Sequence, residues 1–164
     1  MDMFSYKKIT LTQFVLAFFA MIVSFYMEII LKIDPCHICI AQRFIITLLM
    51  AVFLIELFLS YSKTLNICSS ILLLLGLMLS VHHIHLMKHF DPDGQCLPNF
   101  SYLLSTFGVW EAFSMILNDP VSCSHIPFKP FGINTPVWIL IFYLMEIVLW
   151  ITKIVSSYKR SKPI

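Results

Sequence analysis

The chain has 164 residues, the length of one domain. Apolar residues make up 59% of it and charged residues only 12%, whereas soluble proteins carry about 25% charged residues. A soluble fold of this size could not bury so much apolar surface, so we expect a membrane protein with the lipid bilayer as a partner. The net charge of +2 is too small to indicate a nucleic-acid partner.

Four apolar stretches are each close to the roughly 20 residues that cross a bilayer as a helix. They cover residues 9–31, 38–59, 67–86 and 137–154. The first follows two lysines as a signal peptide would, but it is too long for a cleaved signal and has no clear cleavage site. The sequence therefore predicts an all-α membrane protein: a bundle of four transmembrane helices that forms a single domain over residues 1–164.

The positive charges predict the orientation, because loops rich in Lys and Arg stay in the cytoplasm. With four spans, one side of the membrane carries Lys7, Lys8, Lys63, Lys153, Lys159, Arg160 and Lys162. The other side carries Lys32, Lys88 and Lys129 among acidic residues. We therefore expect both termini in the cytoplasm and two outer loops, at about residues 32–37 and 87–136.

This orientation separates the five cysteines into two groups. Four fall at the outer face, where disulfides persist: Cys36, Cys39, Cys96 and Cys123. Cys68 falls near the cytoplasmic end of the third span, and we assign it no role.

The long outer loop contains a predicted amphipathic helix. After a turn at residues 91–94, apolar residues recur at the spacing of one helix face. They are Phe100, Leu103, Leu104, Phe107, Trp110, Phe113 and Leu117. Such a face, with few charges, is typical of a helix that lies along the lipid headgroups; packing against the spans is the alternative.

Cys36 and Cys39 form a Cys-x-x-Cys pair at the start of the second span. Asp34 suits the N-cap of this helix and Pro35 its first helical position. A helix N-terminus favours the reactive thiolate, so the pair is a candidate redox dithiol. The same spacing can be half of a zinc site, but such a site would normally show a second pair of this kind. The pattern therefore favours redox chemistry, and we predict no metal.

Arg43 lies four residues after Cys39 and shares its helix face. An arginine at the centre of a span costs about 2.5–3.5 kcal/mol on insertion scales and by default indicates a function. Its guanidinium could stabilise negative charge on a carbonyl oxygen of a bound acceptor such as a quinone. The alternative is that the side chain extends to the membrane surface.

Two further groups lie on the outer side. Cys96 and Cys123 are either a staple of the long loop or a link between the membrane-edge dithiol and a soluble partner. Histidines gather at the outer end of the third span: His82, His83, His85 and His89. His82, His85 and His89 share one helix face, which invites a metal hypothesis, but contact with headgroups and water is the commoner role. One of the four could donate a hydrogen bond or a proton to a quinone.

Together, these residues resemble the DsbB family of membrane disulfide-generating proteins. The resemblance covers nearly the whole chain: four spans, the Cys-x-x-Cys-x-x-x-Arg element of residues 36–43, and the second cysteine pair in the second outer loop. It implies a quinone-dependent protein disulfide-generating oxidoreductase of the bacterial inner (cytoplasmic) membrane, with its active loops facing the periplasm. Its cofactor would be ubiquinone or menaquinone from the membrane pool, and its partner a DsbA-like thioredoxin-fold periplasmic protein.

The resemblance also implies roles for the cysteines. Cys96 would be the sulfur that the partner's thiolate attacks, and Cys123, once released, would pair transiently with Cys36. Cys39 would then be left as a thiolate beside the quinone, which Arg43 would polarise.

His83 resembles, by its distance before Cys96, a histidine that family members place near the quinone. Two other functions compete with this interpretation. One is a membrane metal-binding or transport protein that uses the Cys and His clusters. The other is the vitamin-K-epoxide-reductase type, whose Cys-x-x-Cys pair comes within the last helix, whereas here the fourth span contains no cysteine.

Overall fold

The computed structural model describes residues 3–32, 35–59, 62–88, 100–117 and 132–161. Five helices lie in these ranges: α1 (Met3–Ile29), α2 (His37–Leu59), α3 (Lys63–Lys88), α4 (Phe100–Leu117) and α6 (Thr135–Ser161). Within the described residues, four helices are long and apolar enough to cross a membrane, and they are α1, α2, α3 and α6. The four predicted spans are therefore confirmed. Helices α2, α3 and α6 include their predicted ranges and extend beyond them, whereas α1 begins before residue 9 and ends at Ile29, two residues before its predicted limit.

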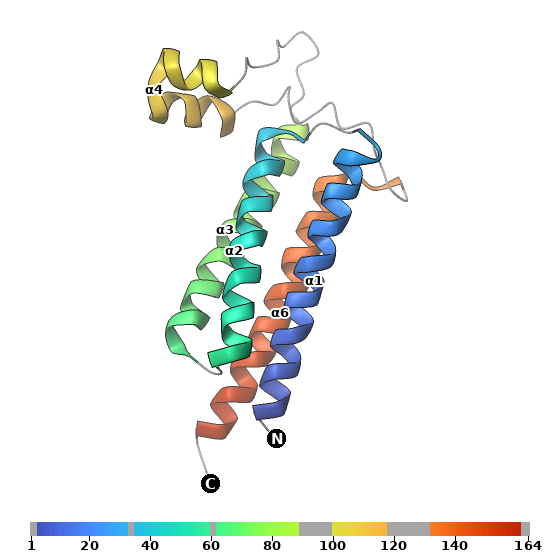
Figure 1. The fold of residues 1–164 in the computed structure, drawn as a ribbon, viewed down its shortest axis with the longest axis vertical. Helices are drawn as coiled ribbons and strands as arrows, with labels where there is room; N and C mark the ends of the chain where they lie inside the picture. Colours follow the sequence, from blue (N-terminus) through green and yellow to red (C-terminus); the bar gives the residue numbers. More distant parts are fainter. Residues whose placement is uncertain (1–2, 33–34, 60–61, 89–99, 118–131, 162–164) are drawn as a thin grey trace.

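The four long helices stand side by side in one bundle (Figure 1). Helix α1 packs against α2 and α6, and α3 packs against the same two helices, so the order around the bundle is α1, α2, α3, α6. The beginning of α1 and the end of α6 lie at one end of the bundle, and α4 lies beyond the other end (Figure 1). That the termini are cytoplasmic and that the whole chain is one domain both stay predictions.

A narrow apolar core holds the bundle together in its middle. Its buried members are Ala17, Ile46, Leu49, Phe53, Leu73 and Tyr143. Large apolar side chains also cover the outside of the bundle, where Phe19 and Phe58 are mostly exposed. A surface of this kind suits lipid, because lipid tails are as apolar as the side chains they meet.

A glycine makes a close contact between two helices in the core. Gly76 of α3 faces the ring of Tyr143 on α6, and a Cβ atom added at Gly76 would overlap that ring. Small residues at such contacts let two helix backbones approach closely within a membrane. The absence of a side chain at Gly76 therefore leaves room for the ring of Tyr143 between α3 and α6.

The predicted helix of the outer loop is present, but it is not continuous. Gly108 has φ 80° and ψ 169°, which no helix allows, so α4 consists of two short helices that fold back on each other (Figure 1). The prediction of one straight apolar face is wrong here, because the face is broken at its midpoint. Trp110, just after the break, is 82% exposed. Whether α4 lies on the lipid headgroups stays a prediction.

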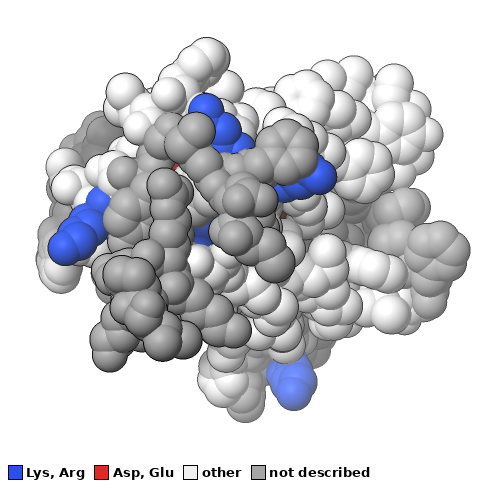
Figure 2. Space-filling view, turned by 90° about the horizontal axis from the view of Figure 1, so that it is seen from below, with Lys and Arg blue, Asp and Glu red and all other residues white. Residues whose placement is uncertain are grey.

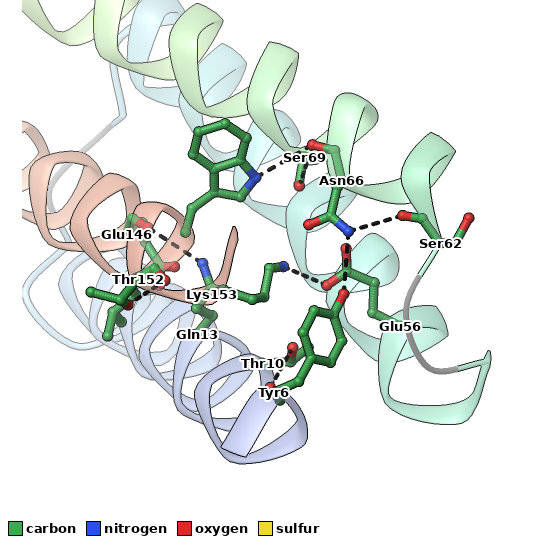
Figure 3. A network of polar contacts seen from close by, with 12 residues as sticks. Tyr6, Thr10, Gln13, Glu56, Ser62, Asn66, Ser69, Glu146, Thr152 and Lys153 are labelled. Atoms are coloured by element: carbon green, nitrogen blue, oxygen red, sulfur yellow. Dashed lines mark hydrogen bonds and ion pairs between the residues drawn. The ribbon is translucent and has the colours of Figure 1, made fainter. Parts of the chain in front are cut away.

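The end of the bundle that holds the beginning of α1 is basic. Seen end-on, Lys and Arg side chains are spread around it, with very little Asp or Glu visible between them (Figure 2). The lysines near the starts of α1 and α3 contribute to this charge: Lys7, Lys8 and Lys63. Lys153 also lies near this end (Figure 3), as the sequence predicted, but it adds nothing to the surface charge, because it is fully buried inside the bundle.

Lys153 belongs to a polar cluster that joins all four long helices near this end (Figure 3). Its ammonium nitrogen lies 2.6 Å from Glu56 Oε2 of α2, and both side chains are fully buried. Asn66 Nδ2 of α3 donates a hydrogen bond to the Tyr6 hydroxyl of α1 at 3.4 Å. The aromatic ring of Tyr6 also lies beneath the Lys153 ammonium, 5.4 Å from ring centre to nitrogen. The charged pair is therefore sealed inside the helix bundle and not exposed to lipid.

Candidate functional site

Cys36 directly precedes α2 and takes its N-cap position. Its backbone oxygen accepts a hydrogen bond from Ile40 N at 3.1 Å, and its Sγ accepts one from Cys39 N at 3.3 Å. A side chain that bonds the third helical N–H is the usual way to satisfy a helix N-terminus. The assignment of Asp34 as N-cap and Pro35 as first helical residue is therefore wrong. The helix begins two residues after Pro35, and Asp34 itself lies outside the described residues.

This cap brings the two sulfurs of the predicted dithiol together. Cys36 Sγ and Cys39 Sγ are 2.9 Å apart, and both residues are thiols in this structure. Since a disulfide bond is about 2.05 Å long, a small movement of either side chain would let the bond form. Cys36 is buried against Ile38 and Leu86, while Cys39 is only partly buried. The pair is thus placed to alternate between dithiol and disulfide.

His83 of helix α3 lies beside the two cysteines. The side chain is fully buried, and its Nε2 lies 3.6 Å from Cys36 Sγ. Among the described residues, its other ring nitrogen, Nδ1, has no hydrogen-bond partner. The ligand atoms of Cys36, Cys39 and His83 all lie within 4.8 Å of one another.

Of the four histidines that spacing alone left open, the structure places beside the dithiol the one that the family resemblance had named, His83. His83 follows Gly76 and Ser80 on the buried face of α3, which directs it into the bundle. His82 is partly buried and His85 is exposed. The face that the sequence suggested for metal binding is therefore not the one that reaches the cysteines, and its last member, His89, lies outside the described residues.

Arg43 reaches across from α2 to α1. Its Nε donates to Ser24 Oγ at 2.6 Å, its Nη2 donates to the Ser24 carbonyl at 3.1 Å, and its Nη1 pairs with Glu28 Oε2. The guanidinium also lies over the ring of Phe25, 5.3 Å from its centre. An ionised side chain at the edge of an apolar span is stabilised by such partners, because they replace the water that it has lost. Sequence spacing did not reveal this contact, since Glu28 lies in another helix.

Some hydrogen-bonding groups at this site have no partner among the described residues. A guanidinium has five N–H donors, and the contacts made within the described residues engage three of them. Gln42, next to Arg43, is buried, and neither atom of its amide has a partner among the described residues. On the lipid side, Ile40 and Phe44 expose apolar surface beside Arg43. Sequence reasoning passed over Gln42, although a buried amide in an apolar span was a usable signal.

Two predicted site residues, Cys96 and Cys123, lie outside the described residues. Cys68 is exposed on α3, close to the basic end of the bundle and far along the helix from His83. Of the six predicted site residues, the structure therefore describes four, and it gathers Cys36, Cys39 and His83 into one cluster with Arg43 one helical turn deeper.

Comparison with known proteins gives one consistent family. A family model described as "Disulfide bond formation protein DsbB" matches residues 6–152. A "Disulfide bond formation protein B" from Xanthomonas oryzae pv. oryzae is 26% identical over 159 residues, covering 91% of this chain and 92% of the relative. A protein of the same name from Methylococcus capsulatus is 28% identical over 119 residues, covering 68% of this chain and 71% of the relative. No solved structure matches the chain significantly.

Proposed function

Because this chain belongs to the DsbB family and is a disulfide bond formation protein of the membrane, we propose that it reoxidises a DsbA-like periplasmic protein with a membrane quinone. In this reaction the dithiol of the partner becomes a disulfide, and the quinone takes up the two electrons and two protons to become a quinol. The observation that carries the proposal is the Cys36–Cys39 pair, 2.9 Å apart at the end of a membrane-spanning helix.

The cysteines would act in sequence. The partner's thiolate attacks Cys96 of a Cys96–Cys123 disulfide and forms a mixed disulfide with it. The released Cys123 thiolate then attacks Cys36 of the Cys36–Cys39 disulfide, which leaves Cys39 as the thiolate. The partner's second thiolate resolves the mixed disulfide, so that the partner leaves as a disulfide, and the released Cys96 thiolate attacks Cys123, so the Cys96–Cys123 bond reforms and Cys36 leaves as a thiolate. Cys36 and Cys39 then hold the two electrons, which a bound quinone would accept as their disulfide reforms. The backbone N–H of Cys39 points at Cys36 Sγ, and a donor in this position stabilises negative charge on that sulfur whenever it forms.

The residues around Cys39 fit a quinone. A quinone presents carbonyl oxygens, which need hydrogen-bond donors, and an apolar ring, which needs apolar surroundings. Two of the five N–H donors of Arg43 make no hydrogen bond within the described residues. His83 Nδ1 and the Gln42 amide are buried near the same helix ends and also have no partner among these residues. We therefore assign Arg43 and His83 to quinone binding and add Gln42 as a candidate. When bound, ubiquinone or menaquinone supplies the two-electron acceptor.

The proposal includes a location and an orientation. The protein is a multi-pass protein of the bacterial inner membrane, with Cys36 and the loop that carries Cys96 and Cys123 on the periplasmic side. The basic end of the bundle supports this orientation, because clustered Lys and Arg favour the cytoplasmic side (Figure 2).

The test is oxidation of a reduced DsbA-like protein by membranes that contain the chain, followed as quinone absorbance. We expect Cys36→Ser and Cys39→Ser each to abolish turnover while membrane insertion is unchanged, because neither variant can form the disulfide. Cys68→Ser is the matched control and should turn over like the unaltered chain. Full turnover by either of the first two variants would refute the proposal.

A metal-binding or transport protein is the second candidate, because the ligand atoms of Cys36, Cys39 and His83 gather within 4.8 Å. This function requires that the purified protein hold a stoichiometric metal and lack oxidase activity. Metal analysis and the turnover assay, made on one preparation, separate the two candidates.

A further inference from the structure

Two soft sulfur ligands and one imidazole nitrogen converge from two helices at the dithiol. Cys36 and Cys39 come from the start of α2, and His83 comes from the buried face of α3. From its spacing, the Cys36–Cys39 pair could supply only half of the ligands of a zinc site, because the sequence has no second Cys-x-x-Cys pair. The tertiary structure supplies a third ligand that is 47 positions away from Cys36 in the chain.

We propose that the reduced form of this centre binds a zinc ion through Cys36, Cys39 and His83, and that zinc thereby blocks the reoxidation of the dithiol. The proposal rests on the function proposed above and adds a regulation of that same site. The oxidised form has no thiolates to offer, so zinc binding would depend on the redox state.

One of the two measured distances already matches a tetrahedral zinc site, and the other requires one side chain to move. With Zn–S of about 2.3 Å and Zn–N of about 2.05 Å, tetrahedral angles place sulfur and nitrogen about 3.6 Å apart and the two sulfurs about 3.8 Å apart. Cys36 Sγ and His83 Nε2 are already 3.6 Å apart. The two sulfurs, now 2.9 Å apart, must separate further, and the partly buried Cys39 is the side chain to do so. The fourth position is left for water, as in other sites with three protein ligands.

The charge balance also favours zinc at this depth. Two thiols lose their protons as Zn²⁺ binds, so two protons are released, two Zn–S bonds form, and no electrons move. The resulting centre of Zn²⁺, two thiolates and a neutral imidazole carries no net charge. A neutral centre is less costly than an isolated ion beside a bilayer. Because both sulfurs are then bound to zinc, they cannot form a disulfide until the metal leaves.

Zinc affinity is measured by competition with a chromophoric chelator. The protein is the full chain with Cys68, Cys96 and Cys123 replaced by serine, so that Cys36 and Cys39 are its only thiols. We expect one zinc ion per reduced chain and none after the pair is oxidised. Equal binding in both redox states, or none in the reduced state, would overturn the inference.

His83 is tested by substitution. His83→Gln should lower zinc affinity by more than the roughly 10–100-fold that loss of an outer-shell partner costs, since here a ligand itself is lost. His82→Gln is the matched control on the same helix and should bind zinc like its parent. Unchanged zinc affinity in a folded His83→Gln chain would show that His83 is not a zinc ligand and would overturn the inference.

A spectroscopic measurement tests the zinc site without any substitution of His83. Cobalt(II) in place of zinc should give sulfur-to-metal charge-transfer absorption and the strong visible bands of a tetrahedral site. Weak octahedral bands without charge transfer would contradict ligation by Cys36 and Cys39.

Activity of the unaltered chain separates this inference from the proposed function. Zinc should inhibit oxidation of the reduced partner, and a chelator should restore it. Normal turnover that zinc does not affect would refute the inference and leave the proposed function intact. Zinc binding as described, in a chain that oxidises no partner when free of metal, would refute the proposed function together with the regulatory part of the inference.

Discussion

At the scale of single residues, the contacts between Arg43 and helix α1 fix the position of the guanidinium. Ser24 and Glu28 hold the guanidinium at all three of its nitrogen atoms, and Phe25 lies beneath it. A long flexible arginine side chain would otherwise sample many positions at the membrane edge, and each lost rotamer costs free energy when an acceptor binds. We therefore propose that Glu28 is a positioning residue, which would act on the reaction through Arg43.

The first prediction concerns this pair. Glu28→Gln removes the anionic partner, so we expect the apparent KM for quinone to rise about tenfold with kcat little changed, since a hydrogen bond to a charged group contributes about 1.5–3 kcal/mol. Arg43→Ala should raise the KM further, and adding Glu28→Gln to it should have no additional effect. Steady-state kinetics with varied quinone make the measurement.

Tyr26→Phe, an exposed position of α1, is the control for these kinetics. Normal quinone kinetics in Glu28→Gln, alongside impaired kinetics in Arg43→Ala, would mean that Arg43 needs no anchor on α1.

At the scale of helices, composition and periodicity were enough to find the elements, but not their interruptions or contacts. The four spans follow from long apolar runs, since in lipid a helix is the only way for an isolated segment to satisfy its backbone. The break of α4 at Gly108 was missed, because a glycine inside an apolar pattern does not reveal its φ angle. The start of α2 was placed two residues too early, since Cys36 caps the helix with a sulfur.

The second prediction concerns the contact between α3 and α6. Gly76→Ala adds a methyl group where the ring of Tyr143 lies, and such overpacking costs about 1–3 kcal/mol. This exceeds the roughly 1 kcal/mol that alanine gains over glycine in a helix. We therefore expect a lower midpoint of unfolding in detergent.

Leu75→Ala, exposed on the neighbouring position, should change that midpoint much less. Tyr143→Leu should restore part of the stability that Gly76→Ala loses, and a Gly76→Ala chain as stable as the parent would contradict the close contact.

At the scale of the whole molecule, a buried charged pair joins two helices that are far apart in the sequence. Lys153 of α6 and Glu56 of α2 are fully buried and 2.6 Å apart, with Tyr6 and Asn66 completing the link to α1 and α3 (Figure 3). A charge inside a bundle is tolerated only when paired, so the pair fixes how the helices are aligned. It lies at the opposite end from the dithiol and takes no part in its chemistry.

The third prediction tests this pair. Lys153→Met and Glu56→Gln should each lower the free energy of unfolding by about 3–5 kcal/mol, because each leaves one buried charged or polar group unpaired. The double variant should lose much less than the sum of the two. Unfolding in detergent measures the cycle, with the exposed Lys63→Met as control. Strictly additive losses would show that the two side chains do not interact.

The sequence by itself determined the four membrane spans and indicated that Cys36 and Cys39 form a pair, because apolar length and cysteine spacing are local properties of the chain. Spacing could not determine which histidine of α3 faces Cys36, and only the family resemblance named His83. Nor could it determine that Glu28 pairs with Arg43 or that Lys153 turns inward to Glu56. Each of these depends on how one helix is rotated against another. That rotation is decided by packing among Gly76, Tyr143 and the rest of the core, which only the assembled bundle contains.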